Sequence, residues 1–389
     1  MNSLCDILSG DDLSKWTKDR IVSKVDKEFI APYVSKYGPE FNECNYVDGT
    51  SYRGELRDGK RSGFGICEYS NGDLYMGFWK DDLFNGEGLY IYKSGEVYIG
   101  DLHLGMKSGR GTYYYRDGNV YIGEWADDKK HGRGEMHYRK LGERYSGGWA
   151  YGKRSGKGEY FYAIGEHFSG EWKEGKKWGF GVHSYASGAK YEGQWVANKA
   201  QGTGTLYYAN GDRYDGEWWE GRKQGGGVYL FNNGAKYDGE WFEDSKEGYG
   251  VLNYANGDIY EGDWKKGEKS GRGVYYYANG DRYEGEWKAD FRHGAGMLKL
   301  NNGDVYVGDW NDGEKNGQGR YEFVNGDIYE GYWKEGKRNG VGRYTWADGN
   351  FYHGNWQDDR MMGEGVSKSQ VGYEARPGSG SQGKYRMNK

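Results

Sequence analysis

The seven histidines and three cysteines are the residues best able to bind a metal or to act as a base or nucleophile. The histidines show no ligand or catalytic spacing, and Cys5, Cys44 and Cys67 form no Cys-x-x-Cys pair. Residues 170–177 imitate the start of a phosphate-binding loop but lack its Ser or Thr. We therefore expect no catalytic residue, no metal site and no cofactor.

Aromatic and glycine residues, by contrast, recur with a regular spacing. A version of Tyr-x-Gly-x-Trp, a Gly-x-Gly, a further aromatic residue and an Asn/Asp-Gly pair return every 23 residues, thirteen times from Tyr52 and once more, truncated, from Tyr352 to Gly365. The spacing slips by one extra residue before Tyr145. Such a period indicates one repeat body, whose length measures extension rather than the number of domains.

Each unit, numbered from its leading aromatic residue, has the pattern of a β-hairpin. Tyr283, Gly285 and Trp287 alternate with polar residues, which predicts a strand with one apolar face. We expect a loop over 288–293, a second strand through positions 16 and 18, and a two-residue turn at each Asn/Asp-Gly pair. The rings of positions 1 and 5 should lie over the glycines of positions 12 and 14, because glycine has no Cβ.

The predicted fold is all-β: an elongated, single-layer, twisted antiparallel ribbon of about fourteen hairpins, with a short N-terminal helix. Two strands per unit, about 4.8 Å apart, make the predicted ribbon on the order of 130 Å long. All three prolines lie outside the repeats, as an uninterrupted hydrogen-bond ladder requires. We divide the chain into an N-terminal segment (1–51), the ribbon (52–365) and a flexible tail (366–389).

Two segments depart from the repeat pattern. An amphipathic helix is predicted within residues 11–25, ahead of Pro32, from acids at its start and apolar residues three and four apart. This helix either caps the exposed edge of the first hairpin or docks into a neighbour in an assembly. Residues 139–144 replace the usual turn of the fourth unit, and we expect a bulge or bend there.

The composition of the chain limits the classes of partner that it is expected to bind. No apolar run is long enough to span a membrane, and the unpaired cysteine pattern favours a reducing compartment. The 54 Lys and Arg against 59 Asp and Glu give a formal charge of −5, which disfavours nucleic acid and anionic membranes as partners. We expect protein partners and no nucleic acid.

The aromatic face of the ribbon is the strongest candidate binding site, because the chain has no second layer to cover it. Either the rings pack on one another and on the glycines, or an aromatic-lined groove remains that binds a peptide, a helix or a second ribbon. The predicted partner-binding aromatic face comprises Trp125, Trp149, Trp172, Trp195, Trp218, Trp241, Trp264, Trp287, Trp310, Trp333, Tyr191, Tyr214, Tyr237, Tyr260 and Tyr283.

Charge also follows the period. The fourth position is mostly acidic and should lie on the face away from the rings, whereas the tenth position is mostly basic and should line one loop edge. These rows either form a self-compensating solvated surface or bind an acidic protein or anionic lipid. The predicted basic edge comprises Lys107, Lys130, Arg154, Lys177, Lys223, Lys246, Lys269, Arg292, Lys315 and Arg338.

Residues 260–264 and 283–287, followed by Gly-Arg-Gly at 271–273 and Asn-Gly-Asp at 279–281, resemble MORN repeats. The resemblance implies an elongated hairpin ribbon that binds other proteins. Because residues 1–51 and 366–389 are too short for an added catalytic or membrane domain, the chain resembles the stand-alone members, which are non-enzymatic scaffolds of cytoskeletal assemblies.

Those stand-alone members include radial-spoke-head proteins. The resemblance therefore implies a cytoplasmic, cytoskeletal protein of a cilium or flagellum axoneme, whose partners are other structural proteins of a large assembly, with a homodimer as an alternative. The competing interpretation is a membrane-associated scaffold that binds anionic phospholipids at cortical or organelle contacts.

Overall fold

The computed structural model describes residues 17–25, 27–28, 31 and 41–368. The predictions on residues 11–16, on Pro32 and on the tail from 369 onward lie outside these residues. The chain forms two compact units, residues 1–209 and 210–389, and each is described by itself. Within the described part of the chain, no helix is long and apolar enough to cross a membrane.

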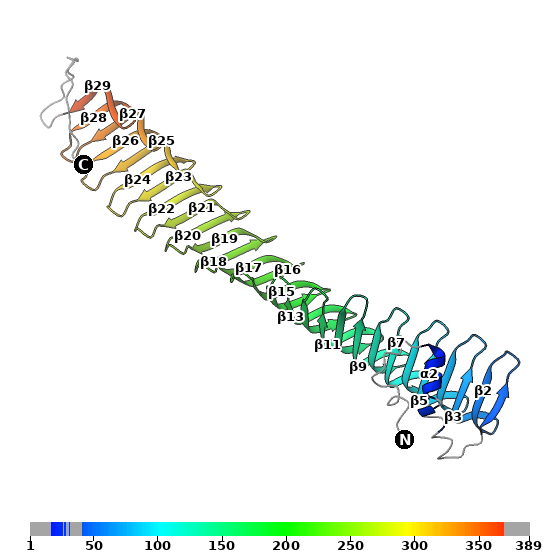
Figure 1. The fold of residues 1–389 in the computed structure, drawn as a ribbon. Coiled ribbons are helices and arrows are strands. Elements are labelled where there is room, and N and C mark those ends of the chain that lie inside the picture. Colours follow the sequence, from blue (N-terminus) through cyan, green and yellow to red (C-terminus); the bar gives the residue numbers. More distant parts are fainter. Residues whose placement is uncertain (1–16, 26, 29–30, 32–40, 369–389) are drawn as a thin grey trace. The chain divides into compact units, whose positions relative to one another are not determined.

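Both units are antiparallel sheets built from consecutive hairpins, in which strands that follow one another in the chain pair with each other (Figure 1). The predicted all-β fold of hairpin repeats with a short N-terminal helix is thereby confirmed. The strands of the first unit are β1 (Asn42–Asn45), β2 (Ser51–Arg57), β3 (Lys60–Glu68), β4 (Leu74–Lys80), β5 (Leu83–Ile91), β6 (Val97–His103), β7 (Met106–Tyr114), β8 (Val120–Ala126), β9 (Lys129–Tyr138), β10 (Glu143–Ala150), β11 (Lys153–Phe161), β12 (His167–Lys173), β13 (Lys176–Ser184), β14 (Lys190–Val196) and β15 (Lys199–Tyr207).

The second unit continues the same hairpin pattern, again with a short and a long strand in each repeat. Its strands are β16 (Arg213–Trp219), β17 (Arg222–Leu230), β18 (Lys236–Phe242), β19 (Ser245–Asn253), β20 (Ile259–Lys265), β21 (Glu268–Tyr276), β22 (Arg282–Lys288), β23 (Phe291–Lys299), β24 (Val305–Asn311), β25 (Glu314–Glu322), β26 (Ile328–Lys334), β27 (Lys337–Thr345), β28 (Phe351–Gln357) and β29 (Arg360–Lys368).

The tight turn of each hairpin lies at positions 7 and 8. Between β22 and β23 only Ala289 and Asp290 are outside the strands, and both have left-handed backbones, with φ of 48° and 71°. Two successive left-handed residues match the right-handed twist of the strands they join. The loop predicted over 288–293 was therefore too long, because most of it belongs to the strands.

The Asn/Asp-Gly pairs form a different turn from the one predicted. At Asn279-Gly280 only the glycine has a positive φ, 93°. The Gly280 N–H donates to the Tyr277 carbonyl and the Tyr277 N–H donates to the Asp281 carbonyl, both at 2.9 Å. The Asn279 side chain accepts the Asp281 N–H at 3.0 Å. The prediction of a two-residue turn was wrong, because the asparagine shapes the loop through its side chain rather than through a left-handed backbone.

The irregular segment of the fourth unit produces no bulge. β9 and β10 pair without a register shift from Glu143↔Tyr138 to Trp149↔Gly132. A longer turn absorbs the extra residue, since the N–H groups of Leu141 and Gly142 both donate to the Tyr138 carbonyl. The register shifts lie inside the hairpins instead, for example at Gly147/Trp149 between β10 and β11. The predicted bulge at 139–144 was therefore wrong, and the alternative of a bend there stays a prediction.

The two glycines of the Gly-x-Gly motif, both in the second strand of the hairpin, have different roles. A Cβ on Gly227, at position 14, would lie 2.4 Å from the Tyr214 hydroxyl oxygen, so the tyrosine ring does lie against this glycine as predicted. Gly225, at position 12, has a φ of 67°, and a Cβ there would meet the carboxylate of Glu217 instead of a ring. The prediction for position 12 was therefore wrong: its glycine permits the backbone of the bulge.

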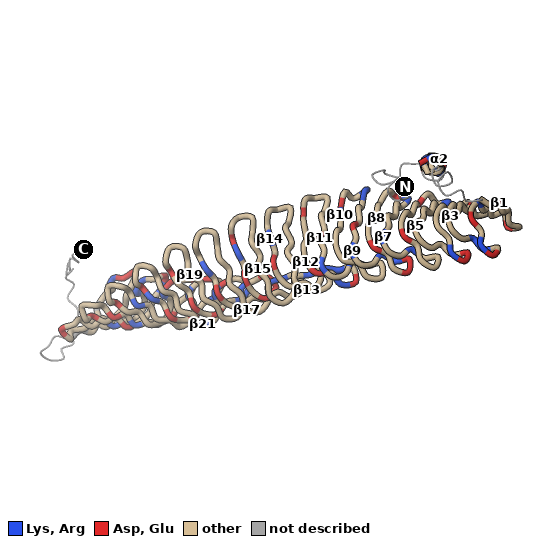
Figure 2. The backbone as a smooth tube through the Cα atoms, turned by 90° about the horizontal axis from the view of Figure 1, so that it is seen from below, with Lys and Arg blue, Asp and Glu red and all other residues tan. Residues whose placement is uncertain are grey.

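Helix α2 (Lys18–Val25) lies on a face of the first unit rather than at its edge (Figures 1 and 2). Ile21 and Val25 are 1% and 0% exposed and pack into a cluster with side chains of β3 to β8, including Met76, Leu89 and Ile99. The predicted cap on the first hairpin edge was wrong, because the first units carry apolar side chains on the face opposite the rings and this face needs a cover.

Replacing Gly227 by alanine should destabilise the protein by about 1–3 kcal/mol, because the new methyl group cannot fit beside Tyr214 without shifting the ring. Gly226 provides a matched control one residue away: its φ is not left-handed, and the nearest atom to a Cβ there is 3.6 Å distant. The midpoint of urea denaturation should fall in Gly227→Ala and stay unchanged in Gly226→Ala. Equal midpoints in the two variants would contradict the ring placement.

Candidate interaction surfaces

A ladder of edge-to-face aromatic contacts runs through each unit. The Trp264 ring lies 5.1 Å from the Tyr260 ring of its own repeat and 5.3 Å from the Tyr237 ring of the preceding repeat, with interplanar angles of 89° and 86°. Its Nε1 donates to the Gly250 carbonyl at 3.1 Å. Trp264, at position 5, is thus held between two tyrosines of position 1 and on the glycine strand of the repeat before its own.

The predicted aromatic site residues are all part of this ladder. All fifteen are between 0% and 7% exposed, the tyrosines 0% or 1% and the tryptophans 3% to 7%. The hydroxyl of each tyrosine donates to the carbonyl of the fourth position, as Tyr260 does to Asp263 at 2.9 Å. Of the two alternatives, the structure has the rings packed on one another. The prediction that they anchor a partner stays a prediction.

The ten residues of the predicted basic edge fold over the rings instead of standing out along a loop. Their Nζ or Cζ atoms lie 3.9 to 5.4 Å from the centre of the tryptophan ring of the next repeat, and Lys246 over Trp264 is the shortest of these contacts. This geometry is that of a cation–π contact. Burial lowers the pKa of Lys246 and of Lys315 to about 8. The charges are therefore largely engaged within the fold.

The acidic residues of position 4 also have an internal role. The Asp263 carboxylate accepts the Arg272 N–H at 2.8 Å, and the Glu217 carboxylate accepts the Gly226 N–H at 3.2 Å. Both N–H groups belong to the bulged segment that follows a position-12 glycine. Sequence analysis missed this role. The available signal was an acid nine residues ahead of the middle residue of Gly-x-Gly.

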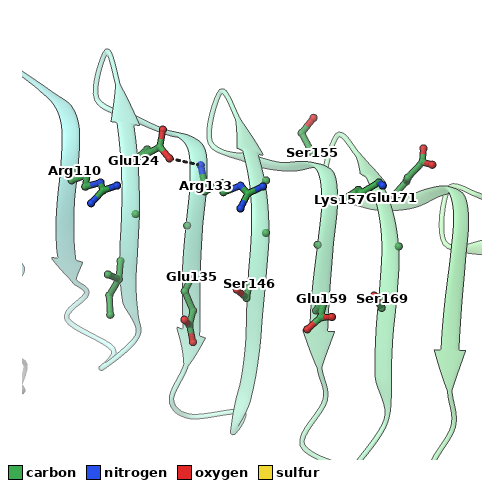
Figure 3. Close-up of a pocket in the computed structure, with 18 of the residues that line it drawn as sticks. Arg110, Glu124, Arg133, Glu135, Ser146, Ser155, Lys157, Glu159, Ser169 and Glu171 are labelled. Atoms are coloured by element: carbon green, nitrogen blue, oxygen red, sulfur yellow. Dashed lines mark hydrogen bonds between the residues drawn. The ribbon is translucent and has the colours of Figure 1, made fainter.

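The face opposite the rings is formed by positions 2, 13, 15 and 17, which in the fourth unit are Ile122, Arg133, Glu135 and His137. We call it the display face. Over β6 to β13 it is hollowed into a groove of about 1540 Å³ (Figure 3). In Figure 3, Arg110, Glu124, Arg133, Lys157 and Glu171 follow one line of this groove, and Glu135 and Glu159 follow a second line further along the strands. Sequence analysis did not single out this groove.

The repeat family model covers most of the chain. MORN repeats match residues 52–74, 75–97, 98–120, 121–141, 145–167, 168–190, 191–213, 214–236, 237–259, 260–282, 283–305, 306–328, 329–351 and 352–372. The chain belongs to the MORN-repeat family. A MORN-repeat chain of this kind is a repeat scaffold suited to binding proteins or lipids, which is the coarse functional class that the match establishes.

Comparison of the chain with curated proteins found no match. Among solved structures, the TCP10 domain of Danio rerio CPAP in complex with a STIL peptide is similar over 54% of this chain and 92% of that one, at 11% identity and a TM-score of 0.34. The SAS-4 TCP domain of Drosophila melanogaster covers 39% of this chain and 83% of its own, at 17% identity and a TM-score of 0.26. Similarities this weak support no conclusion about this MORN-repeat chain.

The sixth MORN repeat departs from its neighbours by a buried polar cluster. In six other repeats a tyrosine of position 16 donates to an acid of the preceding repeat, as Tyr275 does to Asp258 at 2.8 Å. His183 occupies this position, with its Nε2 3.1 Å from Glu166 Oε2 and its Nδ1 3.0 Å from Lys177 Nζ. Burial, and then the neighbouring Lys177, lower the pKa of His183 to about 4.

This cluster predicts a loss of stability in acid. The unfolded histidine has a pKa near 6.5, whereas the folded one stays neutral down to about 4. As the pH falls from about 6.5 to about 4, only the unfolded chain takes up this proton, so the free energy of unfolding decreases, on the order of 2 kcal/mol by pH 4.5. Groups facing His183 are Lys177, Glu166 and His167.

The matched variant for this test is His183→Tyr, which restores the tyrosine–acid pair of the other MORN repeats. Its free energy of unfolding should fall less between pH 6.5 and pH 4.5 than that of the unaltered chain, as measured by urea titrations at both pH values. Parallel losses in the two proteins would show that His183 is not the titrating group.

Proposed function

We propose that the protein is a non-enzymatic scaffold that binds partner proteins through its display face. The observation that carries this proposal is the difference between the two faces of the repeats. The aromatic face is occupied by contacts within the fold: its rings and position-14 glycines pack on one another, and in most repeats a basic side chain of position 10 lies over a tryptophan ring. On the display face of the described repeats, the recurring contacts are ion pairs between partly exposed side chains at the strand starts, such as Arg282 with Glu284 at 2.7 Å.

The display face also changes from repeat to repeat. Position 1 is tyrosine in twelve of the thirteen complete units and phenylalanine in the other. Position 13 holds, in order, Phe64, Glu87, Arg110, Arg133, Lys157, Phe180, Thr203, Gly226, Tyr249, Arg272, Ala295, Gln318 and Val341. A surface that varies along a uniform frame suits the recognition of several different partners.

Several of these variable side chains are large, apolar and exposed. Phe180 is 58% exposed, Val341 is 51% exposed and Tyr249 is 49% exposed. Exposed aromatic side chains on a fixed backbone are typical anchors of protein interfaces. The predicted aromatic site would, in contrast, offer a partner little of its tyrosine and tryptophan rings.

We further propose a place in a cytoskeletal assembly, and specifically a ciliary axoneme. This part of the proposal is supported by the resemblance to stand-alone MORN-repeat scaffolds. Fractionation of ciliated cells tests it: the protein should remain with detergent-extracted axonemes together with spoke or doublet components. A diffuse cytosolic distribution in ciliated cells would contradict the axonemal placement.

Replacing Phe180 by glutamate should remove partner proteins without weakening the fold, because the ring is exposed. Phe291→Glu is the matched control, since Phe291 is 55% exposed but lies beside a tight turn. Quantitative affinity purification from cells should show stoichiometric partners lost in Phe180→Glu and retained in Phe291→Glu, at equal melting temperatures. Equal retention in both variants would remove the display face around Phe180 from the binding surface.

The competing function is binding of anionic phospholipids, and a liposome flotation assay separates it from the protein-binding scaffold. The ten basic residues lie over rings and are not presented together to a flat membrane, so the chain should not float with phosphoinositide-containing liposomes at physiological salt. Flotation that disappears when residues of the basic row are replaced by glutamine would favour the membrane scaffold instead.

A further inference from the structure

We propose that the display-face groove over β6 to β13 binds an amphipathic helix of a partner protein that carries acidic side chains one heptad apart. This inference rests on the proposed scaffold function and names the site and the chemistry of the partner. Four observations in the first unit support it: a helix seated next to the groove, unpaired bases within it, their spacing, and apolar side chains towards both ends.

Helix α2 shows how this face binds a helix. Its apolar residues Ile21 and Val25 are buried against the sheet, and Lys18 Nζ forms an ion pair with Glu68 Oε1 at 2.8 Å. The covered part of this face ends between the third and fourth repeats, as the side chains of position 2 show. Met76 is 0% exposed and Ile99 is 5% exposed, but Ile122 of the next repeat is 49% exposed. The groove thus continues a surface that already accepts one amphipathic helix.

Three bases face the groove without an ion pair to any other described residue: Arg110, Arg133 and Lys157, all exposed. The acids around them are partly engaged elsewhere. The Glu124 carboxylate accepts the Arg133 backbone N–H at 3.1 Å (Figure 3), and Glu135 pairs with Arg144 at 3.0 Å. These bases are therefore free to meet acids of a partner.

Two further acids line the groove and limit where the partner's acids can lie. Glu171 is the cross-strand neighbour of Lys157, and Glu159 lies 3.9 Å from His167. A ligand with acidic side chains along its whole length would be repelled by these two carboxylates. A helix with acids only at seven-residue intervals places each acid at a base, and its uncharged residues pass Glu124 and Glu171, which lie on the same line.

The spacing of the bases matches a helix. Arg110, Arg133 and Lys157 all occupy position 13 of successive repeats, two strands apart, so the sheet separates them by about 10 Å. An α-helix rises about 1.5 Å per residue, so side chains seven residues apart are separated by about 10.5 Å on the same face. Acids at i, i+7 and i+14 of a helix aligned along the groove would meet the three bases in order.

The dimensions of the groove also suit an α-helix that is about half buried in it. From β6 to β13 it spans seven strand spacings, or about 34 Å, the length of roughly 22 helical residues. A helix about 10 Å across occupies on the order of 120 Å³ per residue, so the groove volume of about 1540 Å³ holds somewhat more than half of it. Ile122 and Phe180 offer apolar contacts to the underside, and the polar outer side stays in water.

The probe for this test is a designed 24-residue helix-forming peptide with a leucine stripe and glutamate at positions 2, 9 and 16. Fluorescence anisotropy with the full chain should show at least tenfold tighter binding than the same peptide with glutamine at those positions. Arg110→Glu, Arg133→Glu and Lys157→Glu, combined, should weaken binding of the glutamate peptide at least tenfold. A lysine version of the peptide should regain affinity for this triple variant.

The charge-matched control combines Lys60→Glu, Lys129→Glu and Lys176→Glu, which lie at position 9 next to the tight turns, and it should change affinity less than twofold. Equal affinity for the glutamate and glutamine peptides, or equal losses in both triple variants, would overturn the proposal. So would competition by millimolar inorganic phosphate, which would make the groove an anion site. If Phe180→Glu loses its cellular partners but the combined Arg110, Arg133 and Lys157 variant keeps them, the result supports the scaffold function and contradicts binding of an acidic helix.

Discussion

The packing of the position-5 tryptophans between the position-1 rings of successive repeats is the interaction on which the rest of the structure depends. A single sheet has no second layer to bury its apolar side, so each repeat must bury its rings against its neighbours. Trp264 does this by contacting Tyr237, Tyr260 and the Gly250 carbonyl. The glycines are a consequence, because a Cβ at position 14 would occupy the space of the tyrosine ring.

The same constraint decides how charge is used. A lysine or arginine at position 10 covers the exposed side of the tryptophan, and an acid at position 4 accepts an N–H of the bulged strand. Where these residues occur, both charges are held by contacts within the fold. What remains for binding is the display face, where the fold requires only a strand. Its side chains can therefore differ between repeats, and α2 already occupies the part where they are most apolar.

Much of this fold could be predicted from the sequence, because the period repeats the same evidence many times. The hairpins, the contact of Tyr214 with Gly227 and the short N-terminal helix all follow from the spacing of residue types. The turns were less predictable, because Asn-Gly favours more than one turn type and Ala289-Asp290 carries no strong turn signal. The seat of α2 was mispredicted because a helix that protects an edge and one that covers a face have the same pattern.

The sequence by itself determined the repeat, the strand order of each hairpin and the residues that form the aromatic face, because local alternation and a fixed period specify these directly. Only the tertiary structure decided which charges stay available. Lys246 and Arg133 are both basic residues in the second strand of a hairpin, yet one lies over an indole and the other faces an open groove. That difference arises because positions 10 and 13 lie on opposite faces of the sheet, and the indole that meets Lys246 comes from the next repeat, a contact that exists only once the sheet has formed.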